Sequence, residues 1–191
     1  MPGQDGFVFR ILALHAGDIG HPQHSVELAE RAVSQARGHV DDDAMVLFDI
    51  GLARCHAETG DQRTARAILH RAEPWLTPTA TTELPRWIQL FCPNKASLGR
   101  QTSKAFVALG DVVEAERFLH MSAMAWNPKT HTRIHALSQI ETGLLRWQLG
   151  RHEDAASLWR NAATVLSGVD SDRVTKALTK VARCAPDLLT T

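Results

Sequence analysis

The sequence has no net charge and few cysteines. Each of these two features argues against particular kinds of function. It contains 21 basic and 21 acidic residues, so no global attraction draws it to nucleic acid or to an anionic membrane. Any charge-based binding is therefore expected to be local. The three cysteines, Cys55, Cys92 and Cys184, are an odd number without CxxC spacing, which argues against a disulfide framework and a zinc site. Reduced cysteines fit a cytoplasmic protein best.

Membrane-length apolar runs and catalytic motifs are also missing. The first apolar run, 7–14, is interrupted by Arg10 and has no small-residue cleavage pattern, so we interpret it as a helix of the fold rather than a signal peptide or membrane span. No GxSxG, GxxxxGK[ST] or HExxH motif occurs. We therefore expect no cofactor and favour a role without catalysis.

Two histidine pairs are the best metal candidates in the sequence. His131 and His135 are four residues apart and would share one helical face, while His21 and His24 form a similar pair at a turn. Imidazoles at this spacing can supply two ligands to a metal. Because no third ligand is visible, we interpret both pairs as structural or surface residues and expect no metal site.

A repeated turn is the main feature that the sequence does have. Glycine occurs at positions 20, 60, 110 and 150, and each can be numbered 15 in a unit of 34 residues. Small residues then fall at positions 8, 20 and 27 of all four units: Ala13, Ser25 and Ala32; Ala53, Ala65 and Ala72; Ser103, Ala115 and Ser122; Gly143, Ala155 and Ala162. Position 23 is apolar each time: Leu28, Ile68, Phe118 and Leu158.

Elementary packing explains this pattern. Two antiparallel helices cross closely only where one side chain is small, and the turn between them needs a residue that tolerates positive φ. One helix pair cannot bury its apolar face alone, but stacked pairs can. A fixed period of this kind therefore predicts a solenoid.

These positions resemble the tetratricopeptide repeat, a helix-turn-helix unit with small residues at positions 8, 20 and 27 and glycine at 15. The resemblance covers roughly residues 6–167. It is weak at position 4, often Trp in that family, which here is Phe9, Asp49, Gly99 and Gln139. It implies an all-α, right-handed superhelical solenoid of about four helix pairs. We expect one domain over 1–191, with repeats at about 6–39, 46–79, 96–129 and 136–167.

No segment alternates like a strand, so the whole chain is expected to be helical. The expected helices span about 6–18, 23–37, 43–58, 62–75, 95–109, 112–126, 129–149, 152–166 and 171–185, with a shorter piece near 84–91. An insert at 80–95, carrying Trp87, Ile88 and Phe91, interrupts the repeat. Its apolar residues either seal the joint between the two halves of the array or form a lid over the concave groove.

The segment 171–185 is expected to cap the array. Val174, Leu178, Val181 and Ala185 share one face, and the cations Arg173, Lys176, Lys180 and Arg183 share the other. A repeat array needs such a helix to close its exposed end. We interpret the cations as a solvated outer face, with nucleic-acid binding as the alternative.

The region from Pro85 onward also resembles the C-terminal helical-repeat part of bacterial helix-turn-helix regulators. In those regulators a separate N-terminal domain holds DNA. This chain is expected to lack that domain, because it begins at Met1 almost directly in a repeat, and so nucleic acid is not an expected partner. Arg outnumbers Lys and Ala is abundant, a bias that we attribute to a GC-rich bacterial genome.

The tetratricopeptide resemblance also implies a binding site. First-helix positions 2, 5, 9, 12 and 13 of such units face the ligand in the concave groove. The corresponding candidates in this chain are Arg10, Arg54, Arg100, Lys104, Trp147 and Gln148. An Arg fork matches carboxylate or phosphate, and an aromatic ring beside it can stack on a ligand. The alternative is that carboxylates such as Asp18 and Glu58 neutralise some of these cations.

We therefore expect a cytoplasmic binding or regulatory module that holds a peptide, a protein partner or a small anionic ligand in its groove. The alternative is a small biosynthetic enzyme on the same scaffold, with a pocket lined by His and Arg. A membrane partner is not expected, and pairing with a second copy of the chain is left open.

Overall fold

The computed structural model describes residues 2–75 and 94–189, and within these ranges every regular element is a helix and no strand occurs. Its helices are α1 (Pro2–Asp18), α2 (Pro22–Ala36), α3 (Asp42–Thr59), α4 (Gln62–Ala72), α6 (Asn94–Ala108), α7 (Val112–Met124), α8 (Thr132–Gln148), α9 (His152–Leu166) and α10 (Asp172–Cys184). Two short 3₁₀ helices, η1 (Glu73–Trp75) and η2 (Pro186–Leu189), follow α4 and α10. The predicted all-α class is confirmed. The piece expected near 84–91, with Trp87, Ile88 and Phe91, lies outside the described residues.

The repeated turn works through its glycine and, in two repeats, through the aspartate that follows it. Gly20, Gly60, Gly110 and Gly150 all have φ between 75° and 89°, the left-handed conformation that ends a helix at little cost only in glycine. Asp61 Oδ1 then accepts a hydrogen bond from the Thr64 amide at 3.1 Å. Asp111 Oδ1 accepts one from the Glu114 amide at the same distance. A Gly-Asp dipeptide therefore ends one helix and caps the next.

Small residues let the helices of each pair approach closely. A Cβ added to Gly143 of α8 would lie 2.3 Å from Nε1 of Trp159 in α9. That indole N–H donates to the Ile140 carbonyl at 3.1 Å, so the ring cannot move away without losing its partner. At Gly99 of α6, an added Cβ would lie 2.7 Å from the Phe118 carbonyl oxygen of α7. These contacts explain the small residue at each crossing point.

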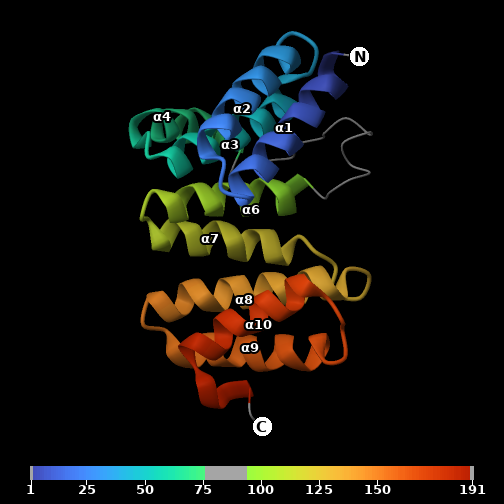
Figure 1. Ribbon diagram of the computed structural model, residues 1–191, viewed down its shortest axis with the longest axis vertical. Coiled ribbons are helices and arrows are strands. Elements are labelled where there is room, and N and C mark those ends of the chain that lie inside the picture. The colour runs from blue at the N-terminus through green and yellow to red at the C-terminus, as the bar shows by residue number, and fades with distance from the viewer. Residues whose placement is uncertain (1, 76–93, 190–191) are drawn as a thin grey trace.

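The pairs α1–α2, α3–α4, α6–α7 and α8–α9 stack into a helical-repeat solenoid with the two ends of the chain at opposite ends of the array (Figure 1). α3 packs on α2, and α8 packs on α7. α6 packs on α3, whereas α4 turns aside (Figure 1). α10 lies across α8 and makes fewer contacts with α9. The first helices α1, α3 and α6 are thus neighbours along one side of the array, and α8 joins the array through its packing on α7.

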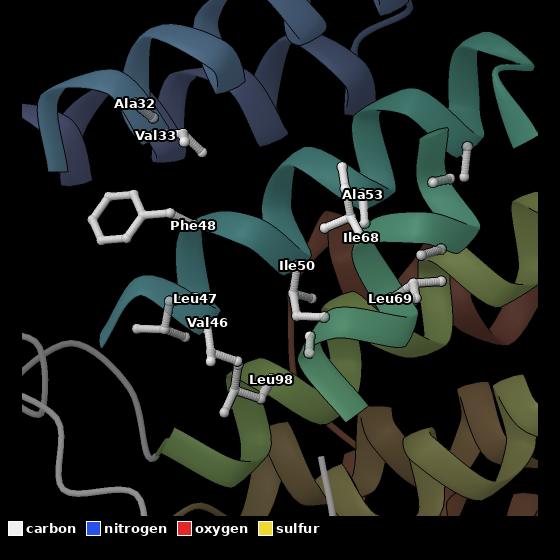
Figure 2. Packing of buried hydrophobic residues seen from close by; sticks show 14 of the residues in the cluster. Ala32, Val33, Val46, Leu47, Phe48, Ile50, Ala53, Ile68, Leu69 and Leu98 are labelled. Carbon is white, nitrogen blue, oxygen red and sulfur yellow. The ribbon is translucent and has the colours of Figure 1, made fainter. Parts of the chain in front are cut away.

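Two large apolar clusters hold the halves of the array together, and a smaller one, Ala115, Leu119 and Leu145, joins α7 to α8. The larger one centres on α3, where Phe48 lies on the side of Ala32 and Val33 of α2, and Val46 lies beside Leu98 of α6 (Figure 2). The second cluster surrounds Trp159 and joins α8, α9 and α10. Burying such side chains supplies most of the driving force for stacking. No helix in the described part of the chain is long and apolar enough to cross a membrane.

Candidate ligand-binding groove

Two adjoining pockets lie along the side formed by α1, α6, α8 and α10. The α6 pocket, of about 480 Å³, is bordered by Arg100, Lys104, Leu144, Gln148, Lys180 and Arg183. The α1 pocket, of about 500 Å³, is bordered by His15, Asp18, Ile140, Glu141, Arg173 and Lys176. Glu141, Leu144 and Lys180 line both pockets. We refer to the two pockets together as the groove.

Three of the six expected site residues meet in the α6 pocket. Arg100, Lys104 and Gln148 all line it. Arg100 donates to Glu141 Oε1 at 2.5 Å, so its charge is already paired across the space between α6 and α8. Lys104 donates from Nζ to Asp18 Oδ1 at 3.0 Å, which links α6 to the end of α1. The two groove cations of α6 thus have carboxylate partners within the chain.

Arg54 lies in the wall of the array rather than at its surface. Its side chain is 2% exposed and donates to Glu58 Oε1 at 2.7 Å. It also donates to Gln101 Oε1 at 2.9 Å and to Asp18. Burial disfavours the charged guanidinium, but Glu58 and Asp18 outweigh it and raise the Arg54 pKa above its usual value. Glu58 and Asp18, the two carboxylates named in the alternative interpretation, thus both pair with Arg54.

Asp18 is the centre of this charge network. Burial opposes its ionisation, but the hydrogen bond from Lys104 and the charge of Arg54 outweigh burial and lower the Asp18 pKa below its usual 3.8. The Lys104 pKa is lowered as well, first because burial disfavours the ammonium ion and then because Arg54 is near. Two cations, Arg54 and Lys104, and two carboxylates, Asp18 and Glu58, thus meet at the junction of α1, α3 and α6.

Arg10 and Trp147 lie apart from both pockets. Arg10 is 5% exposed, and its Nε donates to the Leu47 carbonyl at 2.8 Å. Trp147 is half-buried, with its ring centroid 4.1 Å from that of His152 and 5.4 Å from that of Trp159. The repeat register places both residues on the concave side, but packing against neighbouring helices takes their side chains into the body of the array.

The cations of α10 border the groove, which the sequence interpretation missed. Arg173 and Lys176 line the α1 pocket, Arg183 lines the α6 pocket, and Lys180 lines both. Lys176 pairs with Asp172 at 2.7 Å. Within the described part of the chain, the other three cations have no ion pair. The expected outward-facing charged surface is thus in part a groove wall, because α10 lies across α8 and takes the place of a first helix.

The Arg173 guanidinium shows how close the positive groups are. Its pKa is lowered, chiefly by burial and next by the positive charge of Arg100. Arg100 belongs to α6 and Arg173 to α10, so two elements far apart in sequence direct like charges at one region. Arg100 is paired with Glu141, whereas Arg173 has no ion pair among the described residues, so an anion bound beside Arg173 supplies the missing counter-charge.

The histidine pairs do not form a cluster of ligands. His131 Nδ1 lies 2.9 Å from Thr130 Oγ1, and its ring lies 5.1 Å from that of Trp126. His24 Nδ1 lies 3.2 Å from Glu27 Oε2. Over residues 2–75 and 94–189, no group of three His, Cys, Asp or Glu side chains is placed to hold a metal ion.

Comparison with known families agrees with this architecture. A family model described as tetratricopeptide repeat matches residues 46–71 and 136–161. The first match covers most of α3 and α4, and the second covers most of α8 and α9. None of the curated proteins compared with the chain matches it.

Proposed function

Because the chain is a tetratricopeptide-repeat-like protein, and such repeats are typical of protein-interaction modules, we propose that its groove binds an acidic segment of a partner protein. The α6 pocket is the centre of this site. Arg100 and Lys104 approach it from α6, and Lys180 and Arg183 approach it from α10.

One observation carries the proposal: Lys180 and Arg183 have no ion pair within the described residues, although they border a pocket. Arg100 and Lys104 on the opposite side are held by Glu141 and Asp18. An incoming carboxylate therefore meets two unneutralised cations first. Charges on both walls of a partly desolvated pocket attract an anion more strongly than the same charges on an open surface.

The floor of the α6 pocket adds a second requirement. Val107, Leu119, Leu144 and Leu145 contribute to its lining, so a ligand with only charges would leave apolar surface exposed to water. A segment in which acidic residues flank one or two apolar side chains satisfies both the floor and the walls. A ligand of this pocket must carry both negative charge and apolar surface, which favours a protein segment over a small, fully polar anion.

Short fluorescent peptides test the proposal. One set carries apolar residues flanked by Asp and Glu, a second has the acidic residues replaced by Lys, and a third keeps the charge without the apolar residues. We expect the first set to bind best, measured by fluorescence polarisation, and to bind more weakly as salt rises, because salt screens exposed charges. Free citrate serves as the small-anion probe.

Charge reversal identifies the residues involved. We expect Lys180→Glu and Arg100→Glu to lower peptide affinity by about tenfold or more, and more than Lys180→Gln, while the helical circular dichroism spectrum is unchanged. Arg63→Glu, an exposed position on α4 outside both pockets, is the matched control and is expected to bind like the parent. Equal binding by Lys180→Glu and the parent contradicts the proposed site.

A further inference from the structure

α1 carries a stripe of exposed apolar side chains outside both pockets. Val8, Ile11, Leu12 and Ile19 are 55%, 41%, 47% and 67% exposed. Their spacing of three, four and seven residues places them on one side of the helix. These four residues are half of the eight large apolar residues exposed in the described part of the chain. We refer to them as the α1 stripe.

The repeat register identifies what this side of a first helix normally does. Counted back from the turn glycine, Val8 and Leu12 correspond to Phe48 and Leu52 of α3. Phe48 is buried and lies against α2 (Figure 2), and Leu52 packs in the same clusters. The α1 stripe thus occupies the positions through which α3 stacks on the pair before it.

The fourth pair follows the same rule. In α8 the corresponding positions are Ser138 and Thr142, both buried, and the next position on that side, Leu145, packs with Leu119 of α7. In both cases a preceding helix covers this side of the first helix. In α1 the equivalent side is apolar and uncovered, which leaves one stacking surface of the array without its helix.

The rest of the described surface offers no complementary apolar stripe. The other four large exposed apolar residues are Val107, Val113, Met124 and Val165, and they are spread over α6, α7 and α9. The far end of the array is covered by α10, whose exposed side chains include five charged groups: Asp172, Arg173, Lys176, Lys180 and Arg183. A head-to-tail contact would therefore set apolar residues against charges. A head-to-head contact sets apolar residues against apolar residues.

We propose that two copies of the chain form a dimer through their α1 stripes, related by a two-fold axis. In such an interface each stripe covers the other, so that both apolar surfaces leave water together. The stripe residues line neither pocket, and both grooves of the dimer stay open. Two open grooves can engage two acidic segments of one partner, which raises the effective concentration for the second contact.

Sedimentation velocity of the full chain over a range of concentrations tests this proposal. We expect a monomer–dimer equilibrium in which Leu12→Lys and Ile19→Lys each raise the dissociation constant by about tenfold or more, because a charge replaces a buried apolar group. Val113→Lys is the matched control: Val113 is 62% exposed on α7, and we expect its variant to dimerise like the parent. A parent that stays monomeric, or a Leu12→Lys variant that dimerises like the parent, overturns the proposal.

Thiol cross-linking tests the head-to-head arrangement. Ile11→Cys lies near the middle of the stripe, so a short bifunctional maleimide is expected to join residue 11 of one copy to residue 11 of the other. The parent chain, which keeps the native cysteines Cys55, Cys92 and Cys184, controls for cross-links that form between native thiols. A cross-link from residue 11 to Cys184 of another copy contradicts head-to-head pairing and supports a head-to-tail contact.

Discussion

Asp18 shows how one residue organises the upper part of the groove. It accepts hydrogen bonds from Lys104 and Arg54, so α1, α3 and α6 are joined at one carboxylate. Arg54 also pairs with Glu58, so two cations and two carboxylates meet at this junction and their charges balance. Asp18 therefore stabilises the junction, whereas the attraction of the groove for anions comes from Lys180 and Arg183, which have no ion pair among the described residues.

Asp18→Asn is expected to lower stability in a pH-dependent way. Because the folded-state pKa of Asp18 lies below its usual 3.8, its contribution is fully present above the unfolded-state pKa and is lost as the pH falls through the folded-state pKa. We expect a cost of about 1 kcal/mol or less near neutral pH, since Asp18 is half exposed to solvent. Thermal melts of the parent and the variant are then expected to converge as the medium becomes more acidic than about pH 4.

Asp170→Asn is the control for that experiment. Asp170 is exposed and has no ion pair among the residues that the structure describes. Its variant is expected to melt like the parent at every pH. A gap between the Asp18→Asn variant and the parent that stays constant down to strongly acidic pH contradicts the role assigned to the Asp18 carboxylate.

At the scale of helices, the distance between paired helices depends on a few small residues. Gly143 faces the Trp159 ring so closely that even one methyl group has no space, whereas Gly51 of α3 faces only the flexible Arg10 side chain, whose Cγ lies 3.5 Å from an added Cβ. Both glycines lie within helices. They therefore separate the effect of a tight crossing from the general effect of glycine in a helix.

We expect Gly143→Ala to destabilise the fold by about 1–3 kcal/mol, because Trp159 must move and lose its hydrogen bond to Ile140. Gly51→Ala is expected to be neutral or to stabilise by about 0.5–1 kcal/mol, since alanine is the better helix former. Urea denaturation of both variants measures the difference. A Gly143→Ala variant as stable as the parent contradicts the close crossing of α8 and α9.

The close approach of the helices in each pair was predictable from sequence, but the position of α10 in the array was not. Small residues such as Ala155 and Ala162 recur at fixed intervals because the two helices of every pair need small side chains where they approach each other. Lys180 and Arg183 follow an amphipathic pattern that identifies a polar face without saying what that face borders. Its surroundings depend on where α10 lies relative to α6 and α8, which is a property of the array.

The six expected site residues also differ in how well the sequence predicts their surroundings. Arg100, Lys104 and Gln148 line the α6 pocket as the repeat register implies. Arg10 and Arg54 are buried because nearby carbonyl and carboxylate oxygens accept their hydrogen bonds. A register specifies the side of a helix, whereas the depth of a long side chain depends on partners contributed by other helices.

At the scale of the whole molecule, the two ends of the array differ. The α1 end exposes apolar side chains, whereas the other end is covered by α10, which inserts Val174 and Val181 into the cluster around Trp159. An array with one open and one covered end has only one surface through which a further helix can stack. The covered end thus confines growth of the array to the α1 side.

Removing residues 168–191 is therefore expected to create a second apolar end. Leu137, Ile140 and Leu166 contribute to the cluster that α10 covers, and a stacked helix pair with such a surface exposed associates or precipitates. We expect the shortened chain to form larger species than the parent, measured by light scattering after size-exclusion chromatography. A full-length variant with Arg173, Lys176, Lys180 and Arg183 all changed to Gln keeps the apolar cover and is expected to match the parent in size. A shortened chain that also matches the parent shows that α10 builds the groove wall without being needed to cover the end of the array.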